Sequence, residues 1–158
     1  MSVLPRLRRL LPLAVLLLAT ACASAPPPAP QGTPGAPAPS AAVERFLRLS
    51  QDKDYVQMGW LFGTAEGPVM RRDPASDVEK RMYALATLLQ NQGYTIRGEE
   101  PIPGRIGAAV RVNVQLQQGN RRPEVPFVAV RGADARWFVE QVAVEAITST
   151  PQPPRGQR

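Results

Sequence analysis

The sequence contains no histidine and only one cysteine, and both scarcities limit the chemistry that it can perform. Without histidine the chain lacks the commonest general base and the commonest metal ligand of proteins. A single cysteine cannot form a disulfide within the chain. Aromatic residues make up only 6% of the chain, whereas nucleic-acid binding calls for a basic stripe with stacking aromatics. We therefore expect neither a metal site nor a nucleic-acid partner.

The amino terminus has the pattern of a secretory signal. Arg6, Arg8 and Arg9 precede an apolar run at residues 10–19, which is too short to span a bilayer as a mature helix. The run ends in the sequence LATAC at residues 18–22, whose small residues suit an extended chain in a peptidase cleft.

This LATAC sequence resembles the lipobox of bacterial lipoproteins. In that family the cysteine receives a diacylglyceryl thioether and becomes the new amino terminus, so the resemblance implies removal of residues 1–21 and lipidation of Cys22. Ala19 stands where the family most often has leucine, a permitted but weaker choice. Ala23, rather than aspartate, follows the cysteine. By the enteric sorting rule this implies an outer-membrane location facing the periplasm.

Two other interpretations of this segment stay open. One is an ordinary signal peptide cut among the small residues at 20–25, and the other is a buried structural cysteine. Lipidation accounts best for a lone cysteine in an exported protein, which has no disulfide partner. Several acyl chains on Cys22 would hold the protein firmly at a membrane, because each buried methylene contributes about 0.8 kcal/mol.

The positive charge of the mature chain is small. Nineteen basic residues become sixteen once Arg6, Arg8 and Arg9 are removed, against thirteen acidic ones, so the net charge falls from +6 to +3. Nearly all of the basic residues are arginine, which together with the abundant alanine and proline is typical of a GC-rich genome.

Residues 22–40 are predicted to form a disordered spacer behind the lipidated cysteine. From residue 25 onward this segment is rich in proline and alanine and has no charge, so it should sample extended polyproline conformations. At about 3.1 Å per residue it would hold the domain up to roughly 50 Å from the lipid. Residues 41–150 suffice for one core, and residues 151–158 are predicted to be a disordered tail.

Helices are predicted in the first half of the domain. Ser40 is a plausible cap for a first helix carrying Val43, Phe46 and Leu47. Asp52 or Asp54 can cap a second, short one. Residues 63–68 should form a loop, because they contain two glycines and a proline. Ser76 should begin the best-defined helix, with the apolar stripe Val78, Met82, Leu85 and Leu89 and a stop at Gly93.

Strands are predicted in the second half. Residues 94–102 and 108–116 form the first pair, the latter with apolar–polar alternation from residue 110 onward. Reversals at 118–121 and 132–135 then separate strands around 125–129 and 137–147. The fold class is α+β, with amino-terminal helices packed on an antiparallel sheet of about four strands.

This order of elements, with the sequence ARWFV at residues 135–139 opening the last strand, resembles the nuclear transport factor 2-like superfamily. The resemblance implies a cone in which a curved sheet wraps around helices; cystatin-like and other small α+β layouts stay open. Enzymes of the superfamily place an Asp or a His with Tyr partners inside the cone. Here Asp73 and Asp77 fit helix capping better than catalysis, and Glu140 and Glu145, five apart on one predicted strand, should face opposite sides.

Four residues are candidates to line a pocket in such a cone: Trp60, Tyr83, Arg111 and Trp137. Each has a simpler interpretation, since the tryptophans and Tyr83 suit a core or its edge. Arg111, with Asn113 and Gln115, suits a solvated outer sheet face.

We expect a membrane-anchored, non-enzymatic envelope lipoprotein without a cofactor, which binds a protein partner or another envelope component. The alternative is a small-molecule carrier or degenerate enzyme that uses the cone interior.

Overall fold

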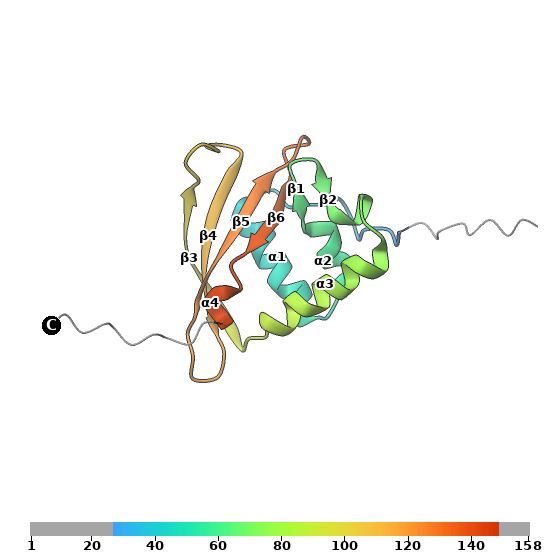
Figure 1. The fold of residues 1–158 in the computed structure, drawn as a ribbon. Coiled ribbons are helices and arrows are strands. Elements are labelled where there is room, and N and C mark those ends of the chain that lie inside the picture. The colour runs from blue at the N-terminus through green and yellow to red at the C-terminus, as the bar shows by residue number, and fades with distance from the viewer. Residues whose placement is uncertain (1–26, 149–158) are drawn as a thin grey trace, which may run out of the picture.

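A layer of helices packs on one face of a four-stranded antiparallel sheet in the computed structural model, which describes residues 27–148 (Figure 1). The chain forms the helices first and the sheet second. The α+β class and the predicted order of elements are therefore confirmed. The predicted signal peptide at residues 1–21, Cys22 and the tail at 151–158 lie outside the described residues.

The first helix, α1, spans Pro39–Gln51 and buries Ala42, Val43, Phe46 and Leu47. The predicted apolar stripe is confirmed, but the predicted cap is wrong. The helix begins at Pro39 instead, with Ala38 in the cap position and no side-chain cap. Proline is favoured in a first helical turn because its missing N–H would have no partner there. The backbone N–H of Ser40 donates to Glu99 Oε1 at 3.0 Å.

The second helix, α2, spans Tyr55–Leu61, and Asp54 caps it as one of the two predicted candidates. Its carboxylate accepts from the backbone N–H of Gln57 at 3.0 Å. Gly59 lets this helix approach its neighbour closely, because a Cβ there would lie 2.5 Å from Val78 Cγ1.

The predicted loop at residues 63–68 contains two very short strands. β1 (Gly63–Thr64) and β2 (Gly67–Pro68) pair antiparallel, and the 3₁₀ turn η1 (Val69–Arg71) follows. The two glycines do not prevent this pairing because each strand is only two residues long.

The third helix, α3, spans Ala75–Leu88 and buries Val78, Met82 and Ala86. It begins after Pro74 without a side-chain cap, so the prediction that Ser76 begins it is one residue late. Asp73 does not cap it either, since its carboxylate pairs with Arg72 and Arg81.

The sheet is a meander in the order β3-β4-β5-β6. Its strands are β3 (Gly93–Pro101), β4 (Ala109–Gln117), β5 (Glu124–Arg131) and β6 (Trp137–Val142). Gly93 therefore begins a strand rather than capping a helix. The predicted reversals are confirmed: Gln118 pairs with Arg121, and Ala135 N donates to Gly132 O at 3.1 Å.

The last strand is shorter than predicted. β6 ends at Val142, and the next residues turn into a short helix, α4 (Glu145–Thr148). Glu140 lies on the strand and Glu145 on the helix, so the prediction that one strand carries both is wrong.

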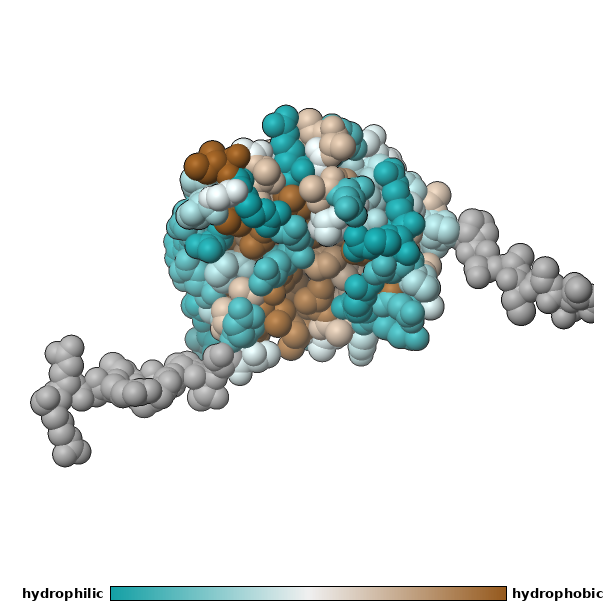
Figure 2. All heavy atoms as spheres, turned by 45° about the horizontal axis from the view of Figure 1, so that its top comes forward, coloured by the Kyte–Doolittle hydropathy of each residue, from teal (hydrophilic) through white to brown (hydrophobic). Residues whose placement is uncertain are grey.

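The core lies between the helices and the sheet and is filled with bulky side chains. Phe46 and Leu47 of α1, Leu116 of β4 and Phe127 of β5 are fully buried there. On the face seen in Figure 2, hydrophobic residues gather in the middle and hydrophilic residues surround them. Within residues 27–148, no helix is long and apolar enough to cross a membrane.

The described part of the predicted spacer is bound to the domain. Residues 28–36, which we call the strap, lie against the domain and hydrogen-bond to it, and Gly35 and Ala36 are buried. These contacts differ from the predicted disorder of residues 22–40. The prediction used composition alone, and composition does not show that the backbone of this proline-rich segment can hydrogen-bond to the domain.

Candidate binding site

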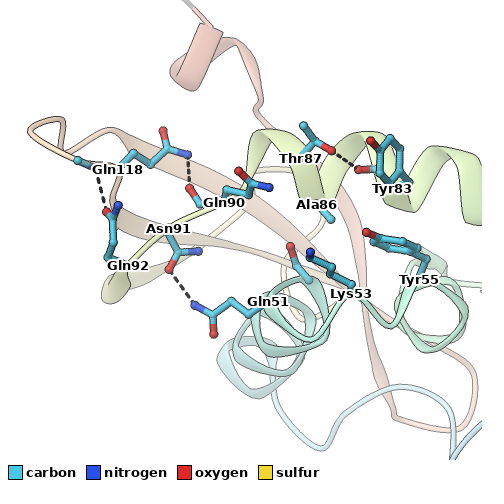
Figure 3. Close-up of a pocket in the computed structure, with 12 residues that line it drawn as sticks. Gln51, Lys53, Tyr55, Tyr83, Ala86, Thr87, Gln90, Asn91, Gln92 and Gln118 are labelled. Carbon is cyan, nitrogen blue, oxygen red and sulfur yellow. Dashed lines mark hydrogen bonds between the residues drawn. The ribbon is translucent and has the colours of Figure 1, made fainter.

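A hollow of about 640 Å³ opens where α1 and α3 end, beside the hairpin that joins β4 to β5 (Figure 3). We call it the tyrosine–amide hollow. Two tyrosines, Tyr55 and Tyr83, stand at one end of it, and Gln118 and Gly119 of the hairpin close the other.

Side-chain amides are the commonest polar groups in the wall of the hollow. They come from the end of α1, from the residues just after α3 and from the hairpin, and they are Gln51, Gln90, Asn91, Gln92 and Gln118. Among the described residues that line the hollow, Lys53 alone is charged. The wall is therefore polar and close to neutral.

Part of the amide wall is held in place by hydrogen bonds. Gln51 Nε2 donates to Asn91 Oδ1 at 3.0 Å. Gln118 Nε2 donates to the carbonyls of Leu88 and Gln90, each at 2.8 Å, and Gln92 Oε1 accepts from the N–H of Gly119 at 2.8 Å. These bonds satisfy carbonyls near the end of α3 that have no partner within a helix. The hollow is thus preformed in the protein.

The tyrosines supply an aromatic surface. Their rings meet edge to face, with centroids 5.6 Å apart, a favoured arrangement for aromatic pairs. The Tyr83 residue is 58% exposed, so its ring can be reached from solvent. Within the described part of the chain neither hydroxyl makes a hydrogen bond, and the side chain of Gln90 makes none either. These groups are free to bind a ligand.

Helix ends set the electrostatics of the hollow. α1 and α3 both finish there, and a helix carboxyl end carries a partial negative charge. Lys53, held at φ +58° just after α1, places a positive charge at the same spot. The two effects oppose each other, so the hollow does not select strongly for an anion or a cation.

The structure does not bring the four predicted pocket residues together. Tyr83 lines the tyrosine–amide hollow and Arg111 a different one. Trp60 is 8% exposed and donates its indole N–H to Pro28 O at 2.7 Å. Trp137 pairs through its backbone with Ala36. The bulky core occupies the interior in which they were predicted to meet.

Arg111 lies on the face of the sheet opposite the helices, in a shallow hollow of about 400 Å³. Glu100 and Asn113 line it too: Arg111 Nη1 lies 3.7 Å from Glu100 Oε2, and Asn113 Nδ2 donates to Glu100 Oε1 at 3.0 Å. Gln115 does not line this hollow and instead accepts from Arg97 Nη2 at 2.6 Å. These polar groups satisfy one another, as on a solvated outer face.

Three of the four acidic residues considered for catalysis, Asp73, Asp77 and Glu140, are engaged in ion pairs. Arg81 and Arg72 hold the pKa of Asp73 below its usual value, chiefly through the hydrogen bond from Arg81. Asp77 pairs with Lys80 at 3.3 Å. Glu140 accepts two hydrogen bonds from Arg105, at 2.7 and 3.0 Å, and this contact raises the pKa of the guanidinium. Within residues 27–148, no group of three His, Cys, Asp or Glu side chains is placed to hold a metal ion.

The sequence prediction included Tyr83 but missed the amides. A signal for them was present, because Gln90-Asn91-Gln92 follows the longest helix and Gln117-Gln118 opens a hairpin. Their convergence depends on the sheet returning beside the end of α3, which no local pattern reveals.

No family model matches the chain, and neither a curated protein nor a solved structure matches it.

Proposed function

We propose that this protein is a lipid-anchored envelope protein whose tyrosine–amide hollow binds neutral sugar rings of the kind found in cell-wall glycan. The observation that carries the proposal is the combination in one preformed hollow of an exposed aromatic ring, several amides and almost no charge.

The chemistry of the wall suits hydroxyl-rich, uncharged ligands. A side-chain amide both donates and accepts hydrogen bonds, as does a sugar hydroxyl. An exposed aromatic face packs against the C–H groups of a sugar ring, and the free hydroxyls of Tyr55 and Tyr83 add two more polar contacts. A few placed polar groups beside an aromatic surface are typical of small-molecule sites.

The anchor part of the proposal rests on the amino-terminal sequence. The LATAC sequence at residues 18–22 supports lipidation of Cys22, and Ala23 supports an outer-membrane location facing the periplasm. A nuclear transport factor 2-like relationship is supported by the order of three helices and a four-stranded meander, with Trp137 opening the last strand.

The interior of the fold does not favour the alternative of a carrier or a degenerate enzyme. Phe46, Leu47 and Phe127 are fully buried where the cone would need an open pocket. We therefore place ligand binding at the surface hollow and propose no catalytic step.

Binding is tested with the mature protein and insoluble cell-wall glycan. Cosedimentation should retain the wild type, and Tyr83→Ala should weaken binding at least tenfold, which corresponds to about 1.4 kcal/mol. Ile106→Ala is the matched control, because Ile106 is 81% exposed but does not line the hollow. Lipopolysaccharide micelles in a parallel arm distinguish cell-wall sugars from lipopolysaccharide sugars. Equal retention of wild type and Tyr83→Ala would contradict the proposal.

The anchor is tested separately by mass spectrometry of the native protein. We expect an acylated amino-terminal cysteine, detergent-phase partitioning and outer-membrane markers on a sucrose gradient, all of which Cys22→Ser should abolish. An unmodified amino-terminal fragment in the soluble periplasm would overturn the anchor without affecting the sugar site.

A further inference from the structure

The strap binds the domain through its backbone carbonyls. The indole N–H of Trp60 donates to Pro28 O at 2.7 Å. The Gln57 side chain, in a residue only 4% exposed, donates to Ala29 O at 3.3 Å and accepts from the N–H of Gln31 at 2.7 Å. Gln57 thus pairs with the strap as a neighbouring strand would.

Two arginines from different elements hold the other half of the strap. Arg45 of α1 donates to Gln31 O at 3.1 Å and to Gly35 O at 3.2 Å. Arg136, from the turn before β6, donates to the same Gly35 O at 2.9 Å and to Pro34 O at 3.4 Å. Hydrogen bonds from charged donors are stronger than neutral ones, so this end of the strap is firmly fixed.

The strap finally joins the sheet edge. Ala36 exchanges both backbone hydrogen bonds with Trp137, at 2.9 and 2.8 Å. Gly35 makes this approach possible, since it has φ +76° and a Cβ there would lie 2.8 Å from Arg136 Cβ. The strap is therefore fixed to the domain at both of its ends, and it pairs with the first residue of β6.

The strap begins far from the tyrosine–amide hollow. α2 runs antiparallel to α3, because Gly59 lies against Val78 in the first turns of α3, whereas Tyr55 meets Tyr83 further along. Pro28 binds Trp60, at the Gly59 end of this pair. The hollow lies at the other end, where α3 finishes beside Gln90. Val78 and Thr87 are separated by about 14 Å along the helix axis, at 1.5 Å per residue.

From this arrangement we infer that the docked strap keeps the domain close to the lipid surface and turns the tyrosine–amide hollow away from it. The inference rests on the lipid anchor proposed above for Cys22. Pro28 follows Cys22 by six residue steps, which span at most about 20 Å, against the roughly 50 Å expected of a free spacer. The hollow then faces the periplasmic side, where cell-wall glycan lies, and not the lipid headgroups.

The test uses the mature lipidated protein in vesicles that contain a headgroup-attached energy acceptor. A single fluorescent label is placed at Ser76→Cys, in the first turn of α3, or at Thr87→Cys, beside the hollow. Cys22 is acylated and does not react, and both labelled positions are exposed. We expect clearly more energy transfer from position 76 than from position 87, because about 16 Å separates them along the helix.

Two further variants isolate the role of the tether. We call the residues between Cys22 and Pro28 the tether. A flexible insertion of about twelve Gly and Ser residues between Ala25 and Pro26 lengthens the tether and leaves the sequence of the domain unchanged. It should lower energy transfer at both positions and remove the difference between them. The same insertion between Pro153 and Pro154 is the matched control and should change neither.

The outcomes separate the two proposals. Equal energy transfer from both positions on vesicle-bound protein, or no effect of the insertion after Ala25, would overturn the orientation while leaving the anchor intact. Failure of the protein to float with the vesicles would overturn the anchor, and the orientation with it.

Discussion

The two ends of the helical layer differ in how their polar groups are satisfied. At the strap end, Trp60, Gln57 and Arg45 all donate to strap carbonyls. At the hollow end, Tyr55 and Tyr83 hold hydroxyls that have no partner within the described part of the chain. One end is closed by the protein's own backbone, and the other is open.

We therefore assign a structural role to the polar groups at the strap end and a proposed binding role to those at the hollow end. Buried polar groups in a folded protein are normally hydrogen-bonded, and the strap fulfils that requirement for Gln57. The polar groups that line the tyrosine–amide hollow are those that we propose bind a ligand. Substitutions that weaken one end of the helical layer should leave the other end unchanged.

The largest effect is expected from Gly35→Ala. A Cβ at this position would clash with Arg136 and Phe138, and φ +76° strains any L side chain. We expect a loss of about 3 kcal/mol, from overpacking and from the left-handed backbone. Gly32→Ala is the matched control: Gly32 has φ +80° but no atom within 4 Å of a Cβ, so about 1 kcal/mol is expected. Urea unfolding measures both, and equal losses would contradict the close packing of the strap.

Arg45→Ala should come next, at about 1.5 kcal/mol, because it removes two charged hydrogen bonds to strap carbonyls. Arg48→Ala, one turn further along α1 at an exposed position, should stay within about 0.5 kcal/mol of the wild type. Proteolysis of the strap gives a second measurement. Cleavage should accelerate in Arg45→Ala only, and an equal rate in both variants would count against the strap.

Trp60→Phe should cost about 1 kcal/mol, since it keeps an aromatic ring but loses the donor to Pro28 O. In Trp137→Phe no described side-chain hydrogen bond is lost, so a smaller effect is expected. Thermal unfolding ranks the two, and the reverse order would show that the indole N–H of Trp60 contributes nothing.

At the hollow end, Tyr83→Ala should cost only about 0.5 kcal/mol of stability, from the lost edge contact with Tyr55. Its sugar binding should nevertheless fall at least tenfold, as stated above. Tyr83→Phe keeps the ring and should bind between the wild type and Tyr83→Ala. If Tyr83→Ala strongly lowered the free energy of unfolding, the Tyr83 ring would serve to stabilise the fold and not to bind a ligand.

The smallest effect concerns pH. Arg81 lowers the pKa of Asp73 in the folded state, so the ionised carboxylate favours folding. This contribution is present above the usual value of 3.8 and is lost as pH falls through the lowered pKa. Asp73→Asn should therefore slightly lower the unfolding temperature at neutral pH and match the wild type in strong acid. Glu44→Gln, at an exposed position of α1, is the control, and a pH-independent difference for Asp73→Asn would contradict the pairing.

Local sequence patterns predicted most of the fold. The stripe of Val43, Phe46 and Leu47 and the alternation along β4 identified a helix and a strand because their periods, near four and two, are distinct. Helix starts were less predictable. Ser40 and Ser76 are good caps, yet prolines just before them set where α1 and α3 begin.

Neither the docking of the strap nor the tyrosine–amide hollow could be predicted from local sequence patterns, and the physical reason is the same for both. A proline-rich segment binds mainly through its backbone carbonyls and has few N–H donors, and its composition matches that of a disordered spacer. Whether it docks depends on donors such as Trp60 and Arg136, which are distant in sequence and adjacent only in the fold. The amides around Gln90 and Gln118 converge for the same kind of reason.

Amide hydrogen exchange of the mature protein, with and without soluble cell-wall glycan fragments, tests both ends in one measurement. We expect the Ala36 amide to be protected in both samples, because Trp137 O binds it, and we expect glycan to slow exchange only around residues 83–92 and 118–119. Free exchange at Ala36, or glycan protection that spares the hollow, would contradict these expectations.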